Sequence, residues 1–194
     1  MNTPIRLHLL RHADAGDPDA WDRPDEVRPL SPKGRRQAER LGAFLAAADF
    51  ASDAIVTSPL LRARETAEIV ADALRRPVRI DERLAGPLDP ETVEAILSGA
   101  GDPVRPVLVG HDPAFSGLAG ELVGLDELEM KKGTLARIDV ARPLRAGEGV
   151  LRWLVPPDLL RAQRPATGPG AWSIAGDAAI SRSRRQPARR SRPR

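Results

Sequence analysis

Hydrophobic positions along this chain fall into two patterns. Short clusters of aliphatic and β-branched residues bounded by turn residues predict strands, whereas apolar residues that recur every three or four positions predict helices with one buried face. We expect strands at 5–10, 54–57, 78–80, 106–110, 134–140 and 150–155. We expect helices at 32–47, 60–75, 90–98 and 113–123.

The segment around the first helix shows how these elements are bounded. Residues 13–29 are rich in Asp, Pro and Gly and are predicted to form a long loop. Ser31 is a suitable N-cap, and Pro32 follows it at the first helical position. The apolar residues Leu41 and Leu45 then place one face of this helix toward a core.

The order of the elements predicts the fold class. Strands and helices alternate as far as residue 123, and strands dominate after it. This order predicts an α/β fold: a three-layer α/β/α sandwich whose central sheet is mostly parallel, with helices on both faces and an antiparallel edge. A body of about 160 residues can bury close to 70% of its unfolded surface, which is enough for a single core.

Charge divides the chain into two parts. Lys and Arg number 30 against 27 Asp and Glu, a net charge of +3. Residues 164–194 hold eight Arg and one Asp, a net of +7, so residues 1–163 carry 3 − 7 = −4. We therefore predict a domain at 1–163 and a disordered tail rich in Arg, Pro, Gly and Ser at 164–194. The tail is either a solvated extension without a role or a basic arm that contacts nucleic acid, membrane or an acidic partner.

Several classes of protein are excluded by what the sequence lacks. The chain has no Cys, which excludes disulfides, a thiol nucleophile and a Cys-ligated metal. No apolar run approaches the roughly 18 residues of a membrane-spanning helix. The first ten residues lack the apolar core of a signal peptide. We expect a cytoplasmic protein with no membrane partner.

Polar clusters follow three of the predicted strands. They are Arg11-His12, Ser58-Pro59 with Arg62, and Gly110-His111. Ligands of open α/β sheets bind beyond the carboxyl ends of the strands, so these clusters are candidates for one site. Arg matches the oxygen atoms of phosphate, and His can act as a nucleophile or base near neutral pH. His8 lies inside the first strand and is expected to be structural.

A metal site is the competing interpretation of the same clusters. His12 and His111 could bind zinc together with Asp14 or Asp112. Two arginines in the same pocket would repel a divalent cation, however. The residues therefore favour an anion, and phosphate in particular, over a metal.

Four blocks of sequence at these positions resemble the histidine phosphatase superfamily. The blocks are Leu10–Ala15 (LRHADA), Arg28–Ala38 (RPLSPKGRRQA), Thr57–Ala67 (TSPLLRARETA) and Val107–Pro113 (VLVGHDP). Their order and their places at strand–helix junctions match the family over about residues 4–125. Ala13 stands where the family usually has Gly. The small size and the RHADA and GHDP forms are most similar to the SixA-type phosphohistidine phosphatases.

The resemblance implies a catalytic mechanism and a set of site residues. His12 would attack phosphorus and form a phosphohistidine, which water then hydrolyses, while Arg11, Arg62 and His111 would hold the phosphate oxygens. No metal or cofactor is required by this mechanism. Arg64 cannot point in the same direction as Arg62 and is expected at the surface. Arg28 could reach the mouth of the pocket or could equally be solvated.

The proton donor for the leaving group is the open question of the mechanism. Relatives often place a Glu after the third strand, but residues 84–88 contain no carboxylate, and Glu82 comes before them. Asp14 is a candidate donor, and it could equally cap backbone donors of its loop. A weak acid catalyst suits the labile P–N bond of phosphohistidine better than an alkyl phosphate.

The main functional hypothesis is therefore a phosphatase that acts on phosphohistidine of a protein. One alternative is a small-molecule phosphomonoesterase of the same superfamily. The other is a non-catalytic phosphate or nucleic-acid binder that uses the basic tail.

Overall fold

The computed structural model describes residues 4–160, and within them six strands alternate with four α-helices. The strands are β1 (Ile5–Arg11), β2 (Ala54–Thr57), β3 (Val78–Ile80), β4 (Pro106–Gly110), β5 (Leu135–Val140) and β6 (Val150–Val155). The α-helices are α1 (Pro32–Ala47), α2 (Leu61–Leu74), α3 (Pro90–Gly99) and α4 (Ala114–Val123). The predicted tail at 164–194 lies outside the described residues.

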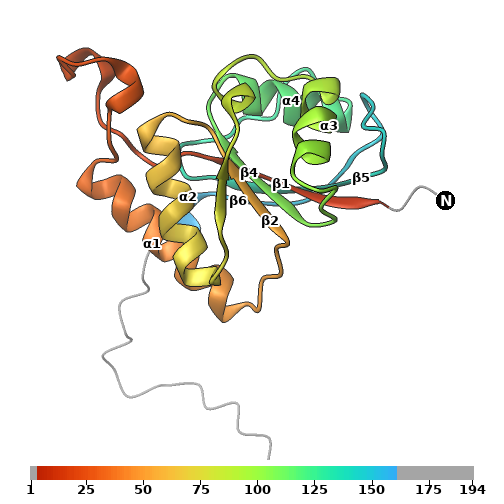
Figure 1. Ribbon diagram of the computed structural model, residues 1–194, viewed down its shortest axis with the longest axis horizontal. Helices are drawn as coiled ribbons and strands as arrows, with labels where there is room; N and C mark the ends of the chain where they lie inside the picture. Colours follow the sequence, from red (N-terminus) through yellow and green to blue (C-terminus); the bar gives the residue numbers. More distant parts are fainter. Residues whose placement is uncertain (1–3, 161–194) are drawn as a thin grey trace, which may run out of the picture. The chain divides into compact units, whose positions relative to one another are not determined.

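The strands form a single mixed sheet in the order β3-β2-β4-β1-β5-β6. The first four pair in parallel, β5 pairs antiparallel with β1, and β6 pairs antiparallel with β5. Helices α1 and α2 cover one face of the sheet, and α3 and α4 cover the other (Figure 1). The predicted α/β/α sandwich with an antiparallel edge is confirmed.

Side chains of β1 alternate between the two halves of the core. Leu7 and Leu9 are fully buried with apolar residues of α3 and α4, whereas Leu10 packs with those of α1 and α2. Successive side chains of a strand point to opposite faces, so a strand at the centre of a sandwich is apolar on both sides. This burial fixes the register of β1 and with it the position of the residues that follow.

His8 is a structural residue, as predicted. It is 2% exposed, and its ring packs edge-on against Phe50 at a centroid distance of 4.8 Å. Its Nδ1 lies 3.0 Å from the carbonyl oxygen of Pro106. A carbonyl can only accept, so Nδ1 carries the proton. Burial lowers the pKa of His8 to about 4, against the opposing effect of this hydrogen bond.

The predicted ends of one helix and the description of one loop need correction. Helix α2 begins at Leu61 because Leu60 is extended, and it ends at Leu74 because Arg75 adopts a left-handed conformation. The predicted loop at 13–29 contains two short 3-10 helices, Pro18–Ala20 and Asp25–Val27. Carboxylate capping stabilises the first of these, since Asp17 accepts from the backbone N–H of Asp19.

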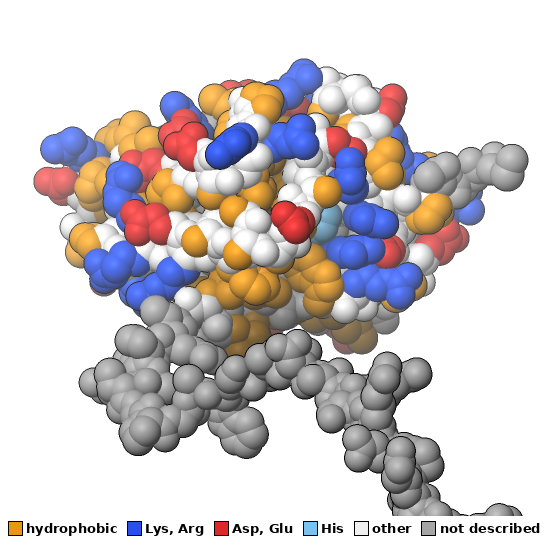
Figure 2. Space-filling view, turned by 90° about the horizontal axis from the view of Figure 1, so that it is seen from below, with side chains coloured by type: hydrophobic (Ala, Val, Ile, Leu, Met, Phe, Trp, Pro, Cys, Tyr) orange, Lys and Arg blue, Asp and Glu red, His pale blue; other side chains and the backbone are white. Residues whose placement is uncertain are grey.

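Charges of both signs are mixed on the surface of this part of the protein. Lys and Arg side chains are interspersed with Asp and Glu over the face shown in Figure 2. Within residues 4–160 no helix is long and apolar enough to cross a membrane. The cytoplasmic location stays a prediction.

The loop after β1 is tied to the start of α1. Ser31, the N-cap of α1, donates its backbone N–H to the carbonyl oxygen of Asp14 at 2.9 Å and its hydroxyl to the carboxylate of Asp14 at 2.6 Å. Gly34 lies against the same loop, and a Cβ built there would lie 1.9 Å from the Asp14 carbonyl oxygen. Only glycine permits this approach.

We expect Gly34→Ala to lower the free energy of unfolding by about 1–3 kcal/mol, because the loop or the helix has to shift. Gly117 is the matched control: it lies on exposed α4 surface, and a Cβ there would meet nothing within 4 Å. Gly117→Ala should raise the free energy of unfolding by about 0.5–1 kcal/mol. Urea denaturation of both variants measures the difference, and equal effects would contradict the role of Gly34.

Candidate active site

The order of the strands brings the three predicted clusters to one edge of the sheet. Strands β1, β4 and β2 are neighbours and parallel, so their carboxyl ends lie side by side. Arg11 is the last residue of β1, and the backbone N–H of His12 donates to the carbonyl oxygen of Gly110 at the end of β4 (2.9 Å). Ser58 follows β2, and Arg62 lies in the first turn of α2.

His12 is buried, and its tautomer is set by a hydrogen bond to the backbone. The residue is 5% exposed, and its Nδ1 lies 2.7 Å from the carbonyl oxygen of Ala13. A carbonyl oxygen accepts, so Nδ1 carries the proton and Nε2 keeps a free lone pair. The ring centroid of His111 lies 5.1 Å from that of His12. The arrangement therefore presents Nε2 of His12 as a nucleophile.

Burial is the largest reason that His12 is neutral. It lowers the pKa of His12 to about 3, and the charges of His111, Arg62 and Arg11 act in the same direction. The hydrogen bond to Ala13 opposes these effects without reversing them. The neighbouring cations thus favour the neutral form, and their contribution is secondary to burial.

His111 is held by Ser58. Its Nε2 lies 2.8 Å from the Ser58 hydroxyl, which also accepts from the backbone N–H of Leu60 at 3.3 Å. If Ser58 donates its own hydrogen to Nε2, then Nδ1 of His111 carries a proton, and this buried atom has no partner among the described residues. Burial first and the charge of Arg62 second lower the pKa of His111 to about 4.

An acidic residue that the sequence did not point to lies between two arginines of the site. The Asp25 carboxylate is 2.9 Å from Nη2 of Arg62 and 2.7 Å from Nε of Arg28. Burial would raise the pKa of Asp25, but the hydrogen bond from Arg28 and the charge of Arg62 outweigh it, and the pKa lies below its usual value. Asp25 therefore aligns both guanidinium groups.

The same contacts decide between the two expectations for Arg28. Its side chain is 9% exposed, and it also donates to the carbonyl oxygen of Ala15 at 2.9 Å. Arg28 therefore belongs to the site and is not a solvated surface residue.

Arg11 is oriented by the end of β4 and by a loop before β5. Its Nη1 lies 3.2 Å from the Asp112 carboxylate and donates to the carbonyl oxygen of Met130 at 2.5 Å. Asp112 in turn accepts from the hydroxyl of Ser116 at 2.6 Å. Both contacts are made by Nη1 of Arg11, so the protein fixes the direction of this nitrogen, while the buried Nε has no hydrogen-bond partner among residues 4–160.

Unsatisfied donors are concentrated around His12. Among residues 4–160, five buried side-chain polar atoms lack a hydrogen-bond partner, and three of them are Arg11 Nε, Arg62 Nε and His111 Nδ1. A buried donor without a partner costs roughly 1–3 kcal/mol, so such atoms are normally satisfied by water or ligand. An anion with several oxygen atoms, such as phosphate, would satisfy the two arginine nitrogens, and also His111 Nδ1 when Ser58 donates to Nε2.

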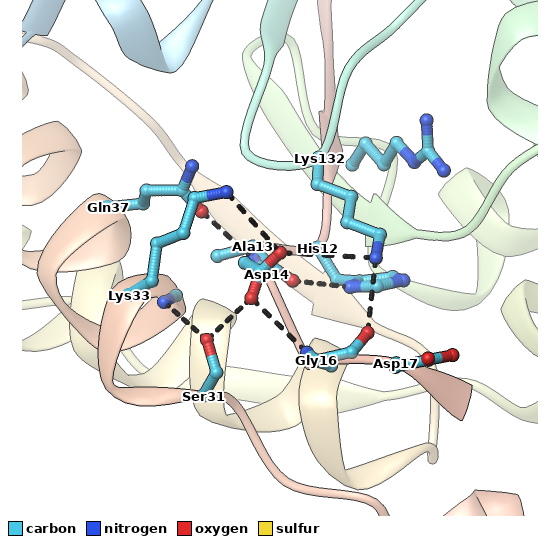
Figure 3. Close-up of polar contacts among 12 residues, drawn as sticks. His12, Ala13, Asp14, Gly16, Asp17, Ser31, Lys33, Gln37 and Lys132 are labelled. Carbon is cyan, nitrogen blue, oxygen red and sulfur yellow. Dashed lines mark hydrogen bonds and ion pairs between the residues drawn. The ribbon is translucent and has the colours of Figure 1, made fainter. Parts of the chain in front are cut away.

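The structure separates Asp14 and Arg64 from this group. Asp14 accepts from Ser31 and from the backbone N–H of Gly16, and Lys33 and Lys132 lie near its carboxylate (Figure 3). Burial would raise its pKa, but these contacts lower it, so the carboxylate form is favoured and the capping interpretation is the one supported. Arg64 is half exposed near Glu68, as expected for a surface residue.

The ligand set of the competing zinc hypothesis does not come together. Within the described chain no three residues among His, Asp and Glu are grouped so that they could hold a metal ion. Asp112 instead contacts Arg11, and Asp14 contacts Ser31.

Comparison with known proteins agrees with this geometry. The model of the histidine phosphatase superfamily (branch 1) matches residues 7–86. An uncharacterized protein of Mycobacterium tuberculosis is 40% identical over 111 residues, which cover 57% of this chain and 67% of that protein. A second uncharacterized protein, of Mycobacterium leprae, is 33% identical over 120 residues, which cover 59% and 71% of the two chains. The chain belongs to the histidine phosphatase superfamily.

Solved structures share the fold at lower identity. The protein histidine phosphatase SixA complexed with tungstate has a TM-score of 0.70 at 24% identity, over 81% of this chain and 100% of that one. The alpha-ribazole phosphatase of Shigella flexneri has a TM-score of 0.60 at 22% identity, over 77% and 96%. These similarities establish a common architecture and leave the substrate open.

The burial of all three histidines predicts an unusual titration. Residues 8, 12 and 111 are the only histidines of the chain, and each has a pKa lowered to about 4 or below. In phosphate-free buffer we expect no histidine ring to titrate near pH 6.5 in the folded protein, as measured by NMR. The urea-unfolded chain, which should titrate at about 6.5, is the control.

The same shifts set the pH dependence of stability. Between about pH 4 and 6.5 the unfolded chain binds protons at these residues and the folded chain does not, so the free energy of unfolding should fall as the pH is lowered through this range. A folded-state titration near pH 6.5 at any of the three residues would contradict the burial described.

Proposed function

We propose that this protein hydrolyses a phosphoryl group through a covalent phosphohistidine at His12. The observation that carries the proposal is the neutral Nε2 of His12 beside buried nitrogens of Arg11, Arg62 and His111 that have no hydrogen-bond partner among residues 4–160. Such donors are arranged before the reaction and stabilise the charge of a phosphoryl transition state without reorganisation.

Two steps account for the bonds and protons. Nε2 of His12 attacks phosphorus, and a P–N bond forms as the bond to the leaving group breaks. The leaving group departs with a proton that it already carries, as a protonated phosphohistidine imidazole does, or that it takes from solvent. Water then attacks the phosphohistidine, the P–N bond breaks, and inorganic phosphate leaves while the imidazole becomes neutral again. Ala13 keeps the proton on Nδ1 throughout, so the same nitrogen acts in both steps. The charge is stabilised by side chains, and no metal is required.

Phosphohistidine of a protein is the substrate that we favour. The cavity beside His111 has a volume of about 630 Å³, and the segment after β3 that lines it carries no carboxylate. The carboxylates of its lining are Asp112, which pairs with Arg11, and the exposed Glu121 and Asp126. Asp14 is ionised by its contacts and is poorly suited to donate a proton. Imidazole leaves readily from phosphorus once protonated, so its departure depends least on a strong acid in the protein.

A small phosphate ester is the second candidate substrate. The observation in its favour is the volume and openness of the same cavity, because a pocket of several hundred Å³ accommodates an ordinary metabolite. A non-catalytic phosphate or nucleic-acid binder remains the alternative from another class, and it concerns the basic tail outside the described residues.

Replacing one phosphate-contacting arginine tests the proposal. Arg62→Ala should reduce kcat/KM by about 10²–10³-fold, because a preorganised donor is lost from the transition state. Arg64→Ala, two residues further along α2 and half exposed, is the matched control and should retain full activity. Steady-state hydrolysis of phosphoramidate measures both, and equal losses in the two variants would refute the site.

A substrate panel ranks the two candidates. In buffer containing EDTA, we expect a phosphohistidine-bearing protein to be dephosphorylated at least about tenfold more efficiently than phosphate monoesters, because its leaving group requires the weaker acid. A panel of sugar and nucleoside monophosphates provides the comparison. Monoesters that turn over faster by orders of magnitude would reject the phosphohistidine assignment, and loss of activity with EDTA would reject metal independence.

A further inference from the structure

A basic cleft of about 570 Å³ adjoins the active site on the side of α1. We define it by its cationic side chains, which are Arg11, Lys33, Arg36, Arg40, Lys131 and Lys132. Asp14 and Asp158 are the acidic residues of its wall, so positive charge predominates. Arg11 also belongs to the phosphate site, which makes the cleft continuous with the place where the reaction occurs.

One face of α1 forms a row of charge along this cleft. Lys33, Arg36, Gln37 and Arg40 occupy positions i, i+3, i+4 and i+7 and therefore lie on the same side of the helix. At 1.5 Å per residue the row extends for about 10 Å. It begins at Lys33, whose ammonium lies 3.7 Å from the Asp14 carboxylate, and runs away from the mouth of the site.

The cations near the mouth are engaged, whereas those further out are not. Lys33 and Lys132 converge on Asp14 two residues from His12 (Figure 3). By contrast, the exposed side chains of Arg36, Arg40 and Lys131 form no ion pair or side-chain hydrogen bond with any other of residues 4–160. Arg36 and Arg40 are like charges at i and i+4, and such pairs destabilise a helix. The contacts among residues 4–160 do not neutralise this repulsion, whereas an anion bound from outside would.

We propose that the basic cleft binds acidic side chains next to the phosphorylated residue of a protein substrate. This inference rests on the proposed function and names the feature of the substrate that the enzyme recognises. A single additional phosphate needs only two or three converging donors, whereas this row spans two turns of a helix. Exposed Lys and Arg side chains spread over this length can pair with several carboxylates on a protein surface. Such charges act mainly by raising the rate at which the substrate associates with the enzyme.

The test compares two synthetic phosphohistidine peptides of equal length, one flanked by Asp and Glu and the other by Asn and Gln. For the unaltered full-length protein we expect kcat/KM to be about tenfold higher for the acidic peptide at low salt, with the preference decreasing as ionic strength rises. Arg36→Glu/Arg40→Glu should abolish or reverse this preference while leaving hydrolysis of free phosphoramidate unchanged.

A double variant with the same change of charge is the control. Arg6 and Arg76 are exposed and lie outside the cleft, so Arg6→Glu/Arg76→Glu should keep the preference for the acidic peptide. An equal preference in both double variants, or none in the parent, would overturn the proposal. A parent that prefers a small bisphosphate over both peptides would overturn it as well.

A binding measurement separates this inference from the proposed function. Fluorescence anisotropy with the unphosphorylated acidic peptide reports on the cleft without any turnover. Binding that weakens in Arg36→Glu/Arg40→Glu would support the cleft even if phosphoramidate were not hydrolysed. Hydrolysis of phosphoramidate without any difference in peptide binding would reject the cleft and leave the catalytic proposal standing.

Discussion

The site depends on an imidazole that burial and the neighbouring guanidinium groups keep neutral. His12 is 5% exposed, and burial removes the solvation that an imidazolium ion would need. Its one proton is committed to the carbonyl of Ala13, so the remaining lone pair has a fixed direction. The nearby positive charges then reinforce the neutral form and supply donors for an anion at the same time.

The sheet order explains how residues that are distant in sequence meet at this imidazole. Because β4 lies between β1 and β2, the ends of the three strands are adjacent, and each contributes a short polar segment. Two carboxylates orient the arginines of the site. Asp25 aligns Arg62 and Arg28, and Asp112 aligns Arg11, so each arginine is held in place while donors remain for a ligand.

Much of the fold and of the candidate site could be predicted from the sequence, and the features that could not be predicted have identifiable physical reasons. Hydrophobic patterning located the strands, of which β1, β2, β4 and β5 are mostly buried, and it identified His8 as a core residue by its place in the alternation of β1. The role of Asp25 could not be predicted, because it lies in a polar loop where no periodicity limits the position of a side chain. Arg28 remained undecided for the same reason, and the cause of the low pKa of His12 required its burial to be known.

The most direct test is to trap the covalent intermediate. The protein would be mixed with labelled phosphoramidate and quenched in alkali, in which phosphohistidine persists, and the labelled peptide would be located by mass spectrometry. The account predicts a phosphoryl group on Nε2 of His12, absent from the His12→Ala variant. Label on His111, or hydrolysis with no labelled intermediate under single-turnover conditions, would contradict it.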